Sequence, residues 1–189
     1  MSRHLILIFL ILMGACKAFA DDTYMFNCKD SKVQGEIKYG VIGGYHFDFN
    51  DCSGRLSYDP LKKEIKSVQV QVKVDSIASN CPWCDRIVVS KRLLDAAQFP
   101  FIKYQANSSD QAESVNGIID LHGVSKGLVS KFILNDKNPN RLYLKGEWAI
   151  KRKEFNIMWN PLLDHGGVLV GDTINVNWEV HANRMKTNG

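Results

Sequence analysis

The stretch Ser67-Val-Gln-Val-Gln-Val-Lys-Val-Asp75 decides the fold, because apolar and polar side chains alternate along it without interruption. All four valines fall on one face of an extended chain, and the glutamines and the lysine fall on the other. Side chains of a strand point alternately to its two faces, so a period of two indicates one packed and one solvated face. Antiparallel sheets commonly have this one-sided polarity. The stretch therefore predicts an antiparallel strand whose valine face covers a hydrophobic core.

The same alternation recurs along the chain, and turn-forming residues separate the runs. It is clear over residues 142–151 and 174–181, and weaker over residues 37–41, 46–49, 101–106, 117–122 and 129–134. Turns are expected at Gly43-Gly44, Asp59-Pro60, residues 107–110, Asn138-Pro-Asn140 and Gly166-Gly167. A helix is expected over residues 85–98, with Asp85 as its N-cap and Pro100 just beyond its end. These elements predict an all-β domain, either an antiparallel barrel or a sandwich, with one short helix.

The N-terminal segment predicts an exported protein. Arg3 and His4 precede the apolar run Leu5-Ile-Leu-Ile-Phe-Leu-Ile-Leu-Met13, and Ala18-Phe-Ala20 has small residues at the spacing that a signal peptidase recognises. The run is shorter than the roughly 20 residues that a membrane-spanning helix needs. We therefore expect residues 1–20 to be a cleaved signal peptide, and residues 21–189 to form one periplasmic or secreted domain. The alternatives are a retained membrane anchor and cleavage before Cys16 with attachment of a lipid.

The charge of the chain argues against a nucleic-acid partner. Lys and Arg number 24 and Asp and Glu number 20, which gives +4, and loss of Arg3 and Lys17 with the signal peptide lowers this to +2. Proteins that bind nucleic acid carry a larger and more clustered positive charge.

Four cysteines lie within residues 21–189: Cys28, Cys52, Cys81 and Cys84. An even number in an oxidising compartment predicts two disulfides, for which three pairings exist. The short separation of Cys81 and Cys84 favours their pairing, which leaves Cys28 for Cys52. Closing that loop of roughly 25 residues stabilises the fold by about 3–3.5 kcal/mol in the chain-entropy model.

Six stretches in this order resemble the YceI-like family, which comprises exported proteins that bind lipids or polyisoprenoids. They are Gly54-Arg-Leu-Ser-Tyr-Asp-Pro60, residues 67–77, residues 85–104 with Gln98-Phe-Pro-Phe101, residues 115–126, Ile150-Lys-Arg-Lys-Glu-Phe-Asn-Ile157 and Val170-Gly-Asp-Thr-Ile174. The resemblance implies an extended, lipocalin-like antiparallel barrel of eight strands with one short helical excursion. It also implies a long apolar channel that holds an isoprenoid, quinone-like or other lipid chain. No cofactor other than such a bound lipid is identified from the sequence.

The inward faces of the expected strands supply the candidate residues of this channel. They are Val70, Val72, Ile102, Tyr104, Ile119, Leu121, Trp148, Ile150, Phe155, Trp159, Val176 and Trp178. The alternative is that these side chains fill a closed core. An eight-stranded barrel is wide enough for either arrangement.

The sharpest local motif is Cys81-Pro-Trp-Cys84. A structural disulfide is the first interpretation, because a redox motif of the thioredoxin type needs a parallel sheet that this sequence does not predict. Thiol-redox activity at the start of a helix and metal binding are the alternatives. The four histidines beyond the signal peptide have no metal-ligand spacing, and no catalytic set of residues is visible.

The sequence thus predicts a protein that is not an enzyme and that carries or stores an apolar ligand inside a barrel, with transient contact with a membrane. One alternative is a periplasmic thiol-redox or electron-transfer accessory that acts through Cys81 and Cys84. Another is a β-sandwich interaction module, although the polar outer faces of the strands argue against it.

Overall fold

The computed structural model describes residues 21–39, 43–108, 111, 113–158 and 170–185, and the expected signal peptide lies outside these ranges. The strands are β1 Asp22–Asn27, β2 Lys32–Tyr39, β3 Gly43–Phe49, β4 Cys52–Asp59, β5 Glu64–Lys73, β6 Ile77–Ser79, β7 Phe101–Ser108, β8 Ser114–Leu121, β9 Val124–Asn138, β10 Arg141–Lys151 and β11 Val170–Arg184. The helices are α1 Pro82–Val89 and the 3-10 turns η1 Val74–Ser76 and η2 Arg152–Phe155. The all-β class with one short α-helix is therefore confirmed.

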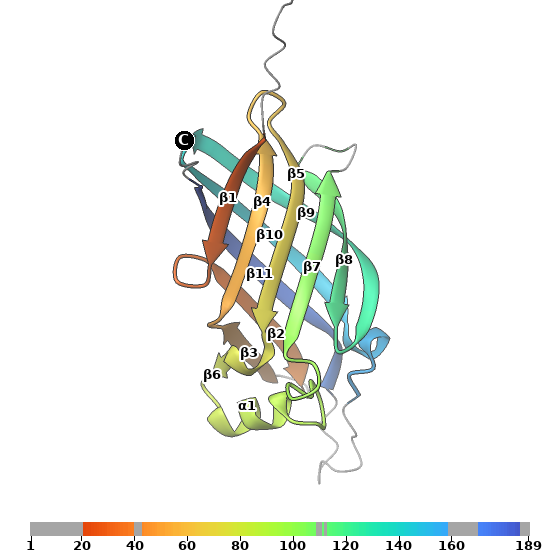
Figure 1. The fold of residues 1–189 in the computed structure, drawn as a ribbon. Helices are drawn as coiled ribbons and strands as arrows, with labels where there is room; N and C mark the ends of the chain where they lie inside the picture. The colour runs from red at the N-terminus through yellow and green to blue at the C-terminus, as the bar shows by residue number, and fades with distance from the viewer. Residues whose placement is uncertain (1–20, 40–42, 109–110, 112, 159–169, 186–189) are drawn as a thin grey trace, which may run out of the picture.

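Eight of the described strands close into an antiparallel barrel in the order β1-β4-β5-β7-β8-β9-β10-β11 (Figure 1). The ring closes where the first strand meets the last, with Tyr24 opposite Arg184 and Met25 opposite Asn183. The ring confirms the eight-stranded barrel and excludes the sandwich.

The outer edge of β11 serves two strands in turn. Its first part pairs with β2, from Val170 opposite Tyr39 to Glu179 opposite Lys32, and its last part pairs with β1. Strand β2 continues the sheet through β3 to β6, and α1 follows β6 at the same end of the barrel (Figure 1). The strands outside the ring and α1 therefore form an extra wall around one end, which we call the mouth end.

Both expected disulfides are present, Cys28–Cys52 and Cys81–Cys84. Cys28 lies in the turn between β1 and β2, and its disulfide ties this turn to the first residue of β4. The amide of Cys28 also donates to the carbonyl oxygen of Cys52 over 3.1 Å. The disulfide therefore fixes the turn between β1 and β2, where the pairing partner of β11 changes from β1 to β2.

Glycines on the inner face of the sheet make room for aromatic rings from neighbouring strands. A Cβ on Gly54 would come within 2.2 Å of the Phe26 ring, and one on Gly146 within 2.4 Å of the Trp178 ring. Both glycines lie directly opposite these aromatic residues in the register. The rings therefore lie across the barrel wall in place of a side chain and fill the interior.

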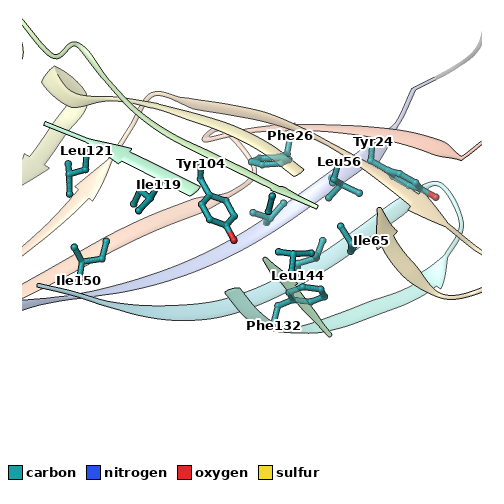
Figure 2. Packing of buried hydrophobic residues seen from close by; sticks show 14 of the residues in the cluster. Tyr24, Phe26, Leu56, Ile65, Tyr104, Ile119, Leu121, Phe132, Leu144 and Ile150 are labelled. Atoms are coloured by element: carbon teal, nitrogen blue, oxygen red, sulfur yellow. The ribbon is translucent and has the colours of Figure 1, made fainter. Parts of the chain in front are cut away.

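The end of the barrel opposite α1 is closed by tyrosines. Tyr24 and Tyr58 pack edge to face with centroids 6.2 Å apart, and both are almost fully buried. Tyr24 donates to the carbonyl oxygen of Pro139 over 2.8 Å, and Tyr58 donates to Asp136 over 2.6 Å. Figure 2 shows Tyr104 in the middle of the core, with Ile119, Leu121 and Ile150 toward one end and Leu56, Ile65 and Tyr24 toward the other.

Three expectations about local structure were wrong. The helix begins at Pro82 and ends at Val89, because Cys81 and not Asp85 is its N-cap. Gly43 and Gly44 are the first residues of β3 and not a turn. Strands β1, β4 and β6 were not expected at all, although β4 contains the family-like stretch that begins at Gly54.

Candidate functional site

An apolar cavity of ≈ 560 Å³ lies at the mouth end, between α1, the outer wall and the barrel. Strand β3 contributes Tyr45, Phe47 and Phe49, and α1 with the following turn contributes Ile87, Val88, Leu93 and Leu94. The barrel contributes Ile102, Leu121, Ile150, Ile174 and Val176, and Ile37, Ile77, Ile157 and Val170 complete the apolar lining. Cavities of this size and character commonly hold small ligands.

The opening of this cavity lies beside the first turn of α1. Trp83 lines the cavity, yet 65% of its surface is exposed to solvent. Asn80 also lines the cavity and is exposed. Since both residues belong to the wall and to the surface, they mark the rim through which a ligand would enter.

A carboxylate fixes α1 over the cavity. Asp85 accepts a hydrogen bond from the Tyr45 hydroxyl over 2.6 Å and bonds from the amide and hydroxyl of Ser79 over 3.0 and 2.5 Å. Burial disfavours the charged form of Asp85, but these hydrogen bonds outweigh it and hold its pKa below the usual value. Asp85 therefore anchors the helix to β3 and β6 as an ion.

The start of α1 is built around the second disulfide. The amide of Cys84 donates to Sγ of Cys81 over 3.3 Å, and the amide of Cys81 donates to the hydroxyl of Ser79 over 3.0 Å. Pro82 occupies the first helical position, where a missing N–H does no harm. Both cysteines line the cavity.

Arg152 is the charged residue in the cavity lining. Its side chain is buried, and its guanidinium donates to the carbonyl oxygens of Gly171, Ile157 and Val170 over 2.8, 2.9 and 3.2 Å. These bonds tie η2 to the start of β11. Among the described residues no carboxylate lies within 4.0 Å of this cation.

A second, smaller cavity of ≈ 80 Å³ lies deeper in the barrel, and Ile102 lines both cavities. Three aromatic rings that line the smaller cavity pack together: Tyr104 against Trp148 with centroids 5.0 Å apart, and Trp148 against Trp178 at 5.9 Å. The Trp148 indole donates to Ser130 over 3.0 Å, and the Tyr104 hydroxyl donates to the carbonyl oxygen of Leu128 over 3.1 Å. Burial raises the pKa of Tyr104 to about 12, so this hydroxyl remains neutral. These rings nearly fill the middle of the barrel, whereas the mouth end keeps the larger cavity.

The candidate channel residues divide between the two cavities. Ile102, Leu121, Ile150 and Val176 line the mouth cavity. Val70, Val72, Tyr104, Ile119, Trp148 and Trp178 line the smaller one. Phe155 is buried in η2 and lines neither, and Trp159 lies outside the described residues.

Sequence reasoning missed the part of the site that lies outside the ring of eight strands. Tyr45, Phe47 and Phe49 alternate with polar residues along β3, and this pattern could have identified their inward face. Ile87 and Leu94 lie within the expected helix, residues 85–98, but the sequence does not say which surface these side chains cover.

The described residues contain no cluster of three or more His, Cys, Asp or Glu side chains suited to a metal ion. His122, for example, contacts the carbonyl oxygen of Phe155 at 3.0 Å and packs edge to face on Phe99. No helix in the described part of the chain is long and apolar enough to cross a membrane.

Fold and site together define a barrel with an apolar cavity at one end. A family model described as the YceI-like domain matches residues 24–182, and the chain belongs to this family. A "UPF0312 protein" of Pseudomonas savastanoi pv. phaseolicola is 28% identical over 151 residues, which is 77% of this chain and 75% of the relative. Another, from Pseudomonas fluorescens, is 31% identical over 143 residues, which is 68% of this chain and 70% of the relative.

Solved structures share the fold. Burkholderia cenocepacia BcnA matches 84% of this chain and 99% of its own with a TM-score of 0.72 and 20% identity. A domain from Saccharophagus degradans, described as polyisoprenoid binding and implicated in plant cell wall breakdown, matches 87% of this chain and 99% of its own, with a TM-score of 0.70 and 12% identity. The Campylobacter jejuni YCEI protein matches 79% of this chain and 90% of its own, with a TM-score of 0.64 and 22% identity.

Proposed function

We propose that this protein is an exported carrier that holds an apolar isoprenoid, quinone-like or other lipid chain in the mouth cavity and acts by binding, not by catalysis. The observation that supports this most is the ≈ 560 Å³ cavity with an apolar lining and a rim at Trp83. Each methylene transferred from water to such a lining contributes about 0.8 kcal/mol. The polyisoprenoid-binding description of the Saccharophagus degradans domain and the expected signal peptide support the same proposal.

The size of the cavity limits the ligand. At about 30 Å³ for each water-sized group, ≈ 560 Å³ accommodates roughly 20 carbon atoms. A longer chain would have to enter the smaller cavity, where the rings of Tyr104, Trp148 and Trp178 leave little room. We therefore expect a lipid of this length, or a longer one whose remainder stays outside the rim.

The test combines extraction of the purified protein with a binding assay. Mass spectrometry of a solvent extract should recover a lipid in near-stoichiometric amount, and the emptied protein should bind a fluorescent fatty chain. Ile87→Trp and Leu121→Trp, which place bulk in the cavity, should each weaken binding about tenfold, since several methylenes lose their place.

Ile118→Trp is the matched control, because Ile118 lies on the same strand as Leu121 but is exposed. Thermal unfolding of each variant identifies any that fail to fold, since overpacking itself destabilises a core. The proposal fails if no lipid is extracted and folded Ile87→Trp binds the chain as well as the control does.

A second candidate function is thiol–disulfide exchange at Cys81 and Cys84. It is favoured by the position of this disulfide at the start of α1, where the helix dipole and the amide of Cys84 would stabilise a thiolate on Cys81. A reduction potential below about −300 mV would mark a structural bridge and exclude exchange. The double variant Cys81→Ser/Cys84→Ser should still bind a lipid chain if the carrier function is correct.

A further inference from the structure

The rim of the mouth cavity carries a large apolar side chain that no other part of the described chain covers. Trp83 is 65% exposed on the first turn of α1 and lines the cavity at the same time. Tryptophan favours the interface between a bilayer and water, where its ring meets the acyl region and its N–H stays hydrated. The side chain thus occupies the place where a lipid would leave a membrane and enter the protein.

Three exposed cations follow this tryptophan in the same segment of the chain. Arg86 lies on α1, and Lys91 and Arg92 lie in the turn that follows it. All three are exposed, and none has a carboxylate within 4.0 Å among the described residues. Residues 82–95 contain two acids, Asp85 and Asp95. Asp85 is engaged by Tyr45 and Ser79, so Asp95 is the one remaining negative charge in this segment beside three positive charges.

The closed end of the barrel has a different arrangement. Leu61 is exposed there, and of the three lysines beside it Lys66 pairs with Glu64 at 2.6 Å and Lys63 with Asp136 at 3.9 Å, while Lys62 has no carboxylate within 4.0 Å among the described residues. Asp59 in the same turn accepts the amides of Leu61 and Lys62. All three cations that follow Trp83 are therefore unpaired, whereas two of the three lysines beside Leu61 are neutralised within the protein.

From these observations we infer that the mouth end, formed by α1 and the turn through Arg92, docks on an anionic lipid bilayer. This inference rests on the proposed function, because the bilayer is the source or the destination of the lipid. Lys and Arg near a membrane are attracted by anionic headgroups. With Trp83 in the interface, an apolar chain passes from the bilayer into the cavity without crossing water.

The test is co-sedimentation of the purified protein with vesicles. Mass spectrometry first determines the N-terminus of the protein that is used. Vesicles of phosphatidylcholine alone are compared with vesicles that also contain phosphatidylglycerol. The protein should bind the anionic vesicles, and added salt should weaken this binding. Arg86→Ser/Lys91→Ser/Arg92→Ser should reduce it about tenfold or more, and Trp83→Ala should reduce it as well.

The matched controls are Lys62→Ser/Lys137→Ser/Arg141→Ser and Leu61→Ala, which remove the same kinds of exposed side chain at the closed end. They should bind anionic vesicles as the unaltered protein does. Equal losses in the mouth and control triples, or equal binding to both kinds of vesicle, would overturn the inference.

Binding of a short, water-dispersed fluorescent fatty chain separates this inference from the proposed function. The mouth triple should take up this probe normally while failing to bind vesicles, because its cavity is intact. If the unaltered protein binds anionic vesicles but never takes up the probe, the carrier function is wrong and so is the reason for docking. If it takes up the probe but does not bind vesicles, only the docking is wrong.

Discussion

At the closed end of the barrel, a single tyrosine determines the ionisation of a carboxylate. Tyr58 donates to Asp136 Oδ2 over 2.6 Å, and this bond holds the pKa of Asp136 below its usual value. Burial together with the same bond raises the pKa of Tyr58 well above its usual range. The pair is therefore a neutral phenol and an ionised carboxylate at neutral pH.

This pair predicts a defined sensitivity to acid. Because the pKa of Asp136 is lower in the folded than in the unfolded chain, its contribution to stability is present above the unfolded value of about 4 and lost as pH falls through the folded pKa. Tyr58→Phe should remove part of the drop in the free energy of unfolding between neutral pH and about pH 3. Urea unfolding at several pH values measures it.

Tyr143→Phe is the control for this change, because Tyr143 is partly buried on β10 and packs on His181 without a carboxylate partner. An identical pH dependence for Tyr58→Phe and Tyr143→Phe would contradict the assignment to Asp136.

At the scale of elements, the two disulfides should differ in what they contribute. Cys28 and Cys52 are separated by 24 residues and Cys81 and Cys84 by 3. The chain-entropy model assigns about 3.5 kcal/mol to the longer loop and about 2 kcal/mol to the shorter one. Cys28→Ser/Cys52→Ser should therefore lower the free energy of unfolding more than Cys81→Ser/Cys84→Ser does.

Chemical unfolding of both double variants under oxidising conditions measures the difference. A larger loss from Cys81→Ser/Cys84→Ser would mean that α1 and the mouth wall contribute more to global stability than the junction of β1, β2 and β4.

Strands were predictable where most inward positions carry an aliphatic or aromatic side chain. This condition holds for β5, where three valines alternate with polar residues, but not for β4. The inward positions of β4 include Gly54, and the ring of Phe26 from β1 fills the space that a side chain would occupy. The hydrophobic pattern of one strand contains no information about a side chain that a neighbouring strand supplies.

The start of α1 illustrates a competition between two local signals. Asp85 is a good N-cap residue, but Pro82 fits the first helical position and the Sγ of Cys81 already caps the helix. Asp85 instead accepts hydrogen bonds from Tyr45, which is distant in the sequence, and from Ser79, which precedes the helix. The decisive partner of Asp85 lies on β3, and the local sequence contains no information about it.

At the scale of the whole molecule, the cavity departs from the single long channel that the resemblance implied. Its candidate residues were identified because they point inward. An inward direction does not distinguish a side chain that lines an open cavity from one that fills the core. Tyr104, Trp148 and Trp178 all point inward and pack on each other, so they fill the middle of the barrel. Open volume remains where the wall leaves the ring, beside α1.

This division predicts how affinity depends on ligand length. Affinity for saturated fatty chains should rise with each added methylene and level off near roughly 20 carbon atoms, when the mouth cavity is full. Trp148→Ala should enlarge the smaller cavity and move the plateau to longer chains, because it removes the central ring of the three that line this cavity.

Titration with a series of chains of increasing length tests this dependence. Trp83→Ala is the control, since it removes an indole at the rim and leaves the three central rings in place. A plateau at the same length in all three proteins would show that the aromatic layer does not limit the ligand.

The closure of the ring by β1 on β11 brings the two ends of the described chain together. Met185 donates its amide to the carbonyl oxygen of Thr23 over 2.8 Å, and Arg184 pairs with Asp22. Both ends lie away from α1 (Figure 1). A surface linker attached at either end of the described chain would therefore immobilise the molecule with its mouth facing the solution. One oriented layer of protein on a sensor could then report lipid uptake directly.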